Sequence, residues 1–180
     1  MMYLSFLLAA VPLVTAHAYD WNIGNTSVWL SSTAYCPPET YLSRTYFGAA
    51  KGFVPTAHIQ VDKDTTEGFV GYMSSQSLIY VSFRGSETIQ NWVDNLDVRQ
   101  TEYPKCDGCE VHEGFYRTEQ TAFPQVLAAV QALKEQFPSY TVVVTGHSLG
   151  AALATLTAFD LMEAGVGSVT SFHFGSPRVG

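Results

Sequence analysis

A serine flanked by glycines is the part of the sequence best suited to chemistry. Ser148 lies in the run Gly146-His147-Ser148-Leu149-Gly150, between three valines at 142–144 and a stretch rich in alanine and leucine. The valines favour a strand buried on both faces, and the alanine-rich stretch favours a buried helix. A serine on such a sharp turn has a strained backbone that holds its hydroxyl clear of the sheet. We therefore predict that Ser148 is a nucleophile; the alternative is a purely structural turn.

The residues around Ser148 fit the same interpretation. Gly146 and Gly150 leave room where a strand and a helix come close together, because a side chain there would collide with the opposite backbone. The start of the helix leaves the backbone amide of Leu149 without a helical partner, so that this amide can face a developing oxyanion. The pattern predicts a nucleophile and one oxyanion donor.

A general base and an orienting carboxylate are missing from the sequence after Ser148. Hydrolases with a serine on this kind of turn place the acid and then the histidine downstream. Asp160 and Glu163 fall in the predicted nucleophile helix, three or more turns from Ser148, which is too far to orient a base. His173 falls in an apolar strand, where we expect a core histidine. The histidines elsewhere are also interpreted as non-catalytic: His58, His112 and His147.

Composition and charge describe one well-buried globular domain, and the N-terminus indicates where the protein goes. The chain has 180 residues, 47% of them hydrophobic and 14% charged, with a net charge of −7, which argues against a nucleic-acid partner. The apolar run at 4–14 is too short to span a bilayer and ends in Ala16-His17-Ala18. Residues 1–18 are therefore predicted to be a signal peptide, and the protein is expected to be secreted without a transmembrane segment.

In a secreted protein, glycosylation and disulfide bonds are expected, and the sequence has a glycosylation motif and three cysteines. Asn25 begins an Asn-Thr-Ser acceptor sequence. Cys106 and Cys109 have a spacing that suits either zinc or a local disulfide, and the lack of a second ligand pair favours the disulfide. Cys36 is left without a partner. No metal and no cofactor is expected.

The coarse pattern of elements alternates strands and helices. We expect one or two helices within 27–53, where Tyr35, Tyr41, Tyr46 and Phe47 are spaced loosely at helical intervals. Strands are predicted at 57–62, 67–74 and 77–83, of which the third is the most apolar and central, and again at 169–174. Residues 100–109 look like a loop. A long helix should follow and run to about 137, either starting or kinking at Pro124.

A short amphipathic segment follows the third predicted strand. Its apolar residues recur at helical spacing within 86–96, with polar residues between them. One interpretation is an ordinary surface helix, and the other is a lid over a lipid-binding cleft. The candidate lid residues are Ile89, Trp92, Val93 and Leu96.

Five motifs in one order closely resemble the fungal-type class 3 lipases, a branch of the α/β-hydrolase fold that also contains feruloyl esterases. The resemblance implies a mostly parallel central sheet with helices on both faces, over a domain at 19–180. The motifs are Phe83-Arg84-Gly85-Ser86, Asn91-Trp92, Val111-His112-Glu113-Gly114-Phe115, Thr145-Gly146-His147-Ser148-Leu149-Gly150 and Phe174-Gly175-Ser176-Pro177-Arg178-Val179-Gly180.

The same resemblance assigns roles to individual residues. It implies that Ser148 is the nucleophile, that Leu149 gives one oxyanion amide, and that Ser86 gives a second amide and a hydroxyl. Members of the family also carry a small disulfide where Cys106 and Cys109 stand. In the family the chain continues with the catalytic Asp and His. We therefore expect this chain to be C-terminally truncated and inactive alone, with Cys36 pairing with a cysteine in the missing part.

The sequence is compatible with three functions. The leading hypothesis is a secreted triacylglycerol lipase that works through an acyl-enzyme on Ser148, with a lipid or ester substrate at an interface. The first alternative is a feruloyl esterase or another carboxylesterase. The second is a hydrolase-like domain that binds an apolar ligand without catalysis.

Overall fold

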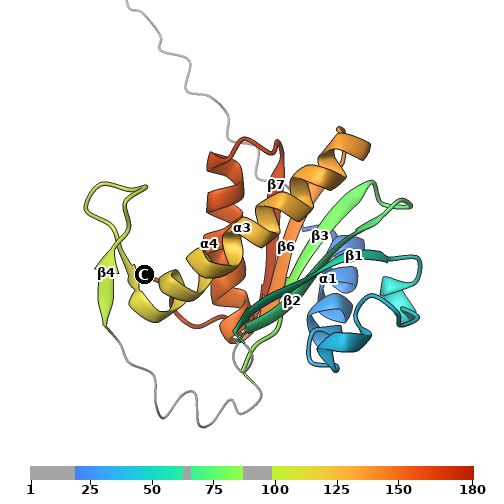
Figure 1. The fold of residues 1–180 in the computed structure, drawn as a ribbon, viewed down its shortest axis with the longest axis horizontal. Helices are drawn as coiled ribbons and strands as arrows, with labels where there is room; N and C mark the ends of the chain where they lie inside the picture. Colours follow the sequence, from blue (N-terminus) through green and yellow to red (C-terminus); the bar gives the residue numbers. More distant parts are fainter. Residues whose placement is uncertain (1–18, 63–65, 87–98) are drawn as a thin grey trace, which may run out of the picture.

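A central sheet with helices on both faces forms the protein (Figure 1). The computed structural model describes residues 19–62, 66–86 and 99–180. The predicted signal peptide at 1–18 and the candidate lid residues Ile89, Trp92, Val93 and Leu96 lie outside the described residues.

Five strands make the sheet in the order β1-β2-β3-β6-β7. The pairs β1–β2 and β2–β3 are antiparallel, whereas β3–β6 and β6–β7 are parallel. All strands except β2 therefore run in one direction, which confirms the predicted mostly parallel sheet with the third strand at its centre. The strands are β1 Val54–Asp62, β2 Thr66–Met73, β3 Leu78–Phe83, β6 Thr141–His147 and β7 Val169–Phe174.

The three consecutive valines of β6 show why this strand is buried on both faces. Successive side chains of a strand point to opposite sides. Val142 and Val144 enter the hydrophobic cluster beneath the two long helices, while Val143 enters the cluster beneath the N-terminal helix. All three are fully buried. The valine run therefore gives each layer of the fold part of its core.

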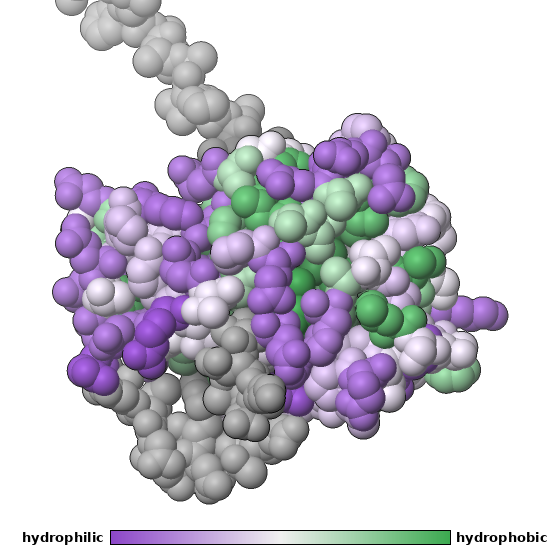
Figure 2. All heavy atoms as spheres, in the orientation of Figure 1, coloured by the Kyte–Doolittle hydropathy of each residue, from purple (hydrophilic) through white to green (hydrophobic). Residues whose placement is uncertain are grey.

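Two helices cover one face of the sheet: α3 Glu113–Gln136 and α4 Leu149–Glu163. Helix α3 starts at Glu113 rather than at Pro124, which lies in its interior. Helix α4 is buried along most of its length, and Leu153 and Leu161 are fully inaccessible. Figure 2 shows hydrophobic side chains over the upper part of α4 and hydrophilic ones further left.

The other face of the sheet is covered by α1, Trp21–Thr33, followed by the 3₁₀ turns η1 Pro38–Thr40 and η2 Gly48–Ala50. The prediction of helix across 27–53 is correct only for the part within α1. Pro38 sits at the start of η1, and Gly48 has a positive φ of 57°. Both features interrupt a helix. Tyr41 and Tyr46 nevertheless pack onto the sheet from this irregular segment.

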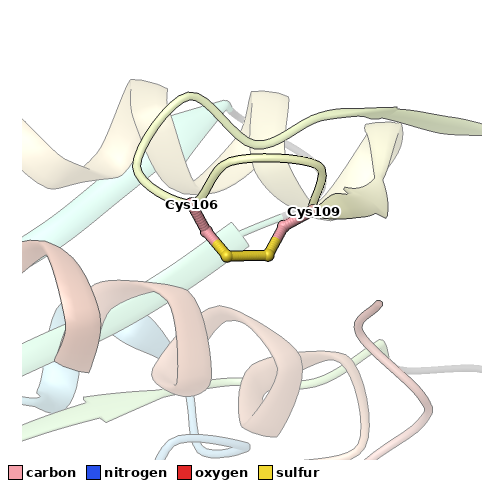
Figure 3. The surroundings of a disulfide bond; sticks show 2 residues. All are labelled: Cys106 and Cys109. Atoms are coloured by element: carbon pink, nitrogen blue, oxygen red, sulfur yellow. A yellow bond between two sulfur atoms is a disulfide. The ribbon is translucent and has the colours of Figure 1, made fainter.

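A small hairpin, β4 Gln100–Glu102 and β5 Glu110–His112, lies beside the start of α3 (Figure 1). The sequence predicted only a loop at 100–109, because three-residue strands leave no periodic pattern. Between the strands Cys106 and Cys109 form the predicted disulfide, and Figure 3 shows their side chains closing the turn. Among the helices that the structure describes, none has the length and apolar character needed to cross a bilayer.

Candidate active site

Ser148 sits on the turn between β6 and α4 in a conformation that L-residues rarely adopt. Its φ is 56° and its ψ is −126°. The Ser148 amide donates to the carbonyl of Phe174 at 3.0 Å, and its carbonyl accepts from the amide of Ala151 at 2.9 Å. These bonds on both sides hold the strained backbone in place. The sharp strand-to-helix turn predicted from the sequence is therefore present.

The glycines of the motif let three backbones meet around this turn. A Cβ on Gly146 would collide with the carbonyl of Gly150, and a Cβ on Gly150 would lie 2.5 Å from the carbonyl oxygen of Phe83. No ordinary side-chain contact is that short. The glycines are thus required by the contact between β6, the first turn of α4 and the end of β3.

The loop after β3 comes to the same edge of the sheet as Ser148. Phe83 pairs with Gly146 in the parallel register, so the residues that follow each strand emerge side by side. A Cβ built on Gly85 would lie 3.2 Å from the Ser148 Cβ. Ser86 is the next residue, and Leu149 is the first residue of α4. The two residues predicted to form the oxyanion hole are therefore chain neighbours of Gly85 and of Ser148, and they belong to two different elements.

Tyr35 is part of this site, although the sequence analysis gave it no functional role. Its hydroxyl forms a 2.7 Å hydrogen bond with Nδ1 of His147, and their rings meet edge to face. Burial raises the pKa of the Tyr35 phenol, while a hydrogen bond from the Gly85 backbone and the charge of Arg84 oppose this. Tyr35 thus connects the residue before Ser148 to the loop before Ser86. It follows α1 in irregular chain, where no periodic pattern points to it.

A small pocket of about 250 Å³ opens beside His147, one residue from the nucleophile. Its lining is largely apolar, and it lies between α1 and the end of β7. Such a pocket suits a hydrocarbon group better than a charged one. Its lining residues are Val28, Ser31, Ser32, Tyr35, His147 and Phe174.

The other histidines in the described part of the chain have roles elsewhere. His58 pairs with Glu67 across β1 and β2. His112 caps α3, where its Nδ1 accepts from the Phe115 amide at 3.2 Å, as a structural histidine would. His173 is exposed on β7, so the expectation of a core histidine is wrong; β7 is the last strand in the described sheet, and one side of it has no neighbour.

No base or orienting acid reaches Ser148 within residues 19–62, 66–86 and 99–180. In this part of the chain no hydrogen bond joins the Ser148 hydroxyl to a histidine, and Asp160 and Glu163 lie in the last turns of α4, as expected. The described residues also contain no cluster of histidine, cysteine and carboxylate side chains that could hold a metal ion.

Two further residues singled out in the sequence lie away from Ser148 in the chain. Asn25, the predicted glycosylation acceptor, is exposed on α1. Cys36 is a free, half-buried thiol.

Comparison with known proteins gives consistent matches. Residues 80–180 match the family described as lipase (class 3). The chain is 41% identical over 119 residues to a lipase of Rhizomucor miehei, covering 64% of this chain and 33% of that protein. It is 36% identical over 115 residues to the secreted mono- and diacylglycerol lipase A of Penicillium cyclopium, covering 64% and 38%. The chain therefore spans between a third and two fifths of the length of these relatives.

A solved structure of a triacylglycerol lipase superposes with a TM-score of 0.80 at 32% identity. The match covers 88% of this chain and 62% of that one. That lipase is described as having a catalytic centre formed by a serine protease triad. The turn at Ser148 lies within residues 80–180, which match the family.

Replacing Ser148 by glycine should stabilise the fold relative to replacing it by alanine. Both changes remove the hydroxyl, but only glycine adopts a φ of 56° without strain. Such strain is typically worth about 1–3 kcal/mol, and part of the gain is offset by the flexibility of glycine in the unfolded chain. We expect Ser148→Gly to exceed Ser148→Ala by about 1 kcal/mol in the free energy of unfolding, measured with urea. The reverse order would show that the turn is not strained.

Proposed function

Because the chain belongs to the class 3 lipase family, we propose that it carries the nucleophile of a secreted serine hydrolase that acts on acylglycerols. The observation that carries the proposal is the strained Ser148 at the carboxyl edge of the sheet, beside the loop that holds Gly85 and Ser86. A serine on such a turn is the arrangement of an acyl-transfer nucleophile, and Ser148 itself is buried, with 5% of its surface exposed.

The proposed reaction begins with attack of the Ser148 hydroxyl on the ester carbonyl, which gives a tetrahedral oxyanion. The amide of Leu149 and the amide and hydroxyl of Ser86 are the proposed donors to this oxyanion, and the start of α4 adds a favourable dipole. Collapse of the intermediate expels the alcohol and leaves the acyl group on Ser148. Water then releases the acid in the second half of the reaction.

The proton taken from Ser148 needs a general base, and that base needs an orienting carboxylate. The described residues supply neither to Ser148, since His147 is bonded to Tyr35 and His58 to Glu67. The proposed catalytic histidine and acid are therefore residues outside 19–62, 66–86 and 99–180. With Ser148 and its oxyanion donors alone, only a small residual rate would be expected.

The proposed substrate is an ester with a long hydrocarbon chain. Two kinds of observation support it: the relatives named above are lipases, and the pocket beside His147 is mainly apolar. The net charge of −7 would also repel polyanionic partners. A neutral lipid ester presented at an interface fits these properties.

Secretion is proposed on separate grounds. The Penicillium relative is named as secreted, and a structural disulfide such as that between Cys106 and Cys109 is typical of an oxidising compartment. Asn25 is exposed on α1, where an attached glycan would extend into solvent.

Ser148→Ala should abolish ester hydrolysis in the full-length protein. Loss of a triad nucleophile costs on the order of 10⁶ in kcat. A fluorescent phosphonate should label the wild-type protein at Ser148, located by peptide mass spectrometry, and should not label the variant. Ser176→Ala, which changes an exposed serine on the loop after β7, is the matched control and should keep full labelling and turnover. Labelling of another serine would overturn the assignment.

Ser86→Ala should lower kcat while leaving KM nearly unchanged. One oxyanion donor is typically worth about 10² to 10³ in kcat, because it acts chiefly in the transition state. The variant keeps the backbone amide, so the loss should be smaller than that of Ser148→Ala. Steady-state kinetics on a soluble short-chain ester separate the two constants. A raised KM with unchanged kcat would assign Ser86 to substrate binding instead.

A further inference from the structure

Two buried carboxyl groups lie between α3 and α4, far along α4 from Ser148. Glu119 is fully buried and Asp160 is 1% exposed. The Gln120 amide nitrogen bridges them, at 2.8 Å from Glu119 Oε2 and 2.9 Å from Asp160 Oδ2. Thr157 donates a further hydrogen bond of 3.2 Å to Glu119. Nothing in the proposed reaction uses this pair.

The hairpin of β4 and β5 is attached to Asp160, which Gln120 joins to Glu119. From the turn between its strands, Lys105 reaches Asp160 Oδ1 at 2.6 Å, and the hydroxyl of Tyr103 donates to the same oxygen at 3.0 Å. The Lys105 ammonium also lies over the ring of Phe123 in α3. Asp160 is therefore the polar point at which the hairpin is fixed to the two long helices.

One cation faces two buried acids in this cluster. The charged and titratable groups around the pair are Asp160 from α4, Lys105 and Tyr103 from the hairpin, and Glu119 itself from α3. Lys105 can balance the charge of Asp160, but a second negative charge would remain unbalanced. Burial and the charge of Asp160 raise the pKa of Glu119 to about 7, against the opposing hydrogen bonds of Gln120 and Thr157 and the charge of Lys105.

We propose that the protonation state of Glu119 controls how firmly the hairpin of residues 100–112 is held. A protonated Glu119 keeps the hairpin packed on α3 and α4, and ionisation of Glu119 loosens the hairpin. An ionised Glu119 has to reach water, since an unbalanced buried charge is costly. Among the elements over the cluster the hairpin has the smallest share of the core, because its two strands have three residues each and only Tyr103 and Val111 enter the small cluster with Phe115, Ala152 and Leu156. Short pairs of strands are marginally stable without such packing. Helices α3 and α4, in contrast, share the main core.

The direction of the pH effect follows from linkage. In the closed state, with the hairpin packed on α3 and α4, the pKa of Glu119 is raised above its ordinary value of 4.5. The protonated carboxyl group therefore stabilises the closed state fully when the pH is below 4.5. The stabilisation is lost as the pH rises toward 7. The equilibrium constant for opening of the hairpin should then increase by up to about tenfold per pH unit between pH 5 and 7, and it should level off above pH 7.

Hydrogen exchange of the hairpin amides tests the proposal. In the hairpin the Tyr103 amide bonds to the carbonyl of Cys109, and the Cys109 amide bonds to that of Cys106. After correction for intrinsic exchange, the protection of these amides in the purified chain should fall between pH 5 and 7, while that of the β6 amides should not. Glu119→Gln should remove the pH dependence. Glu135→Gln, at an exposed position of the same helix, should retain it.

Two further measurements keep the test decisive if Glu119→Gln does not fold. The side-chain carboxyl carbon of Glu119 in the wild-type protein should titrate near pH 7 by NMR; a midpoint near 4.5 would overturn the proposal. Lys105→Met removes the cation that lowers the pKa of Glu119, so its midpoint should rise. Hairpin protection that stays constant across this range, or an unchanged slope in Glu119→Gln, would also overturn it.

Discussion

The close approach of three backbones at the end of β6 is the constraint on which the rest of the structure depends. Strand β6, the first turn of α4 and the end of β3 meet where Gly146 and Gly150 leave no space for a Cβ. This contact forces Ser148 into a positive φ, and it aligns the loop of Gly85 and Ser86 with the start of α4. A parallel β3–β6 pair is needed for this, because only parallel neighbours deliver both loops to one edge.

Much of this arrangement could be predicted from residue patterns. The valines of β6, the alanine-rich α4 and the spacing of the glycines fix the turn at Ser148, and the family match and the solved relative confirm the α/β-hydrolase fold. These features are local, so a short stretch of sequence contains their physical cause. The contact of Gly85 with Ser148 joins residues far apart in the chain, and the ordered family motifs pointed to it.

The features that escaped prediction depend on contacts between distant segments. Tyr35 lies in irregular chain and gains its place only because β6 brings His147 to it. The pairing of Glu119 with Asp160 joins α3 to α4 at positions 41 residues apart by number, and neither residue has a motif around it. The hairpin was missed because three residues are too few to show an alternating pattern. His173 was placed in the core because its strand is apolar, whereas exposure depends on which strands lie beside it.

The mixed sheet also has a consequence for the order in which the fold forms. Strands β1, β2 and β3 follow one another and pair through short connections, so they can associate as soon as residue 83 is available. The β3–β6 pair must wait until Thr141, because the hairpin and the whole of α3 intervene. Closing such a long loop is slow compared with forming adjacent hairpins. The antiparallel half is therefore expected to serve as the template on which the nucleophile strand docks, and pulse-labelled hydrogen exchange during refolding would resolve the two stages.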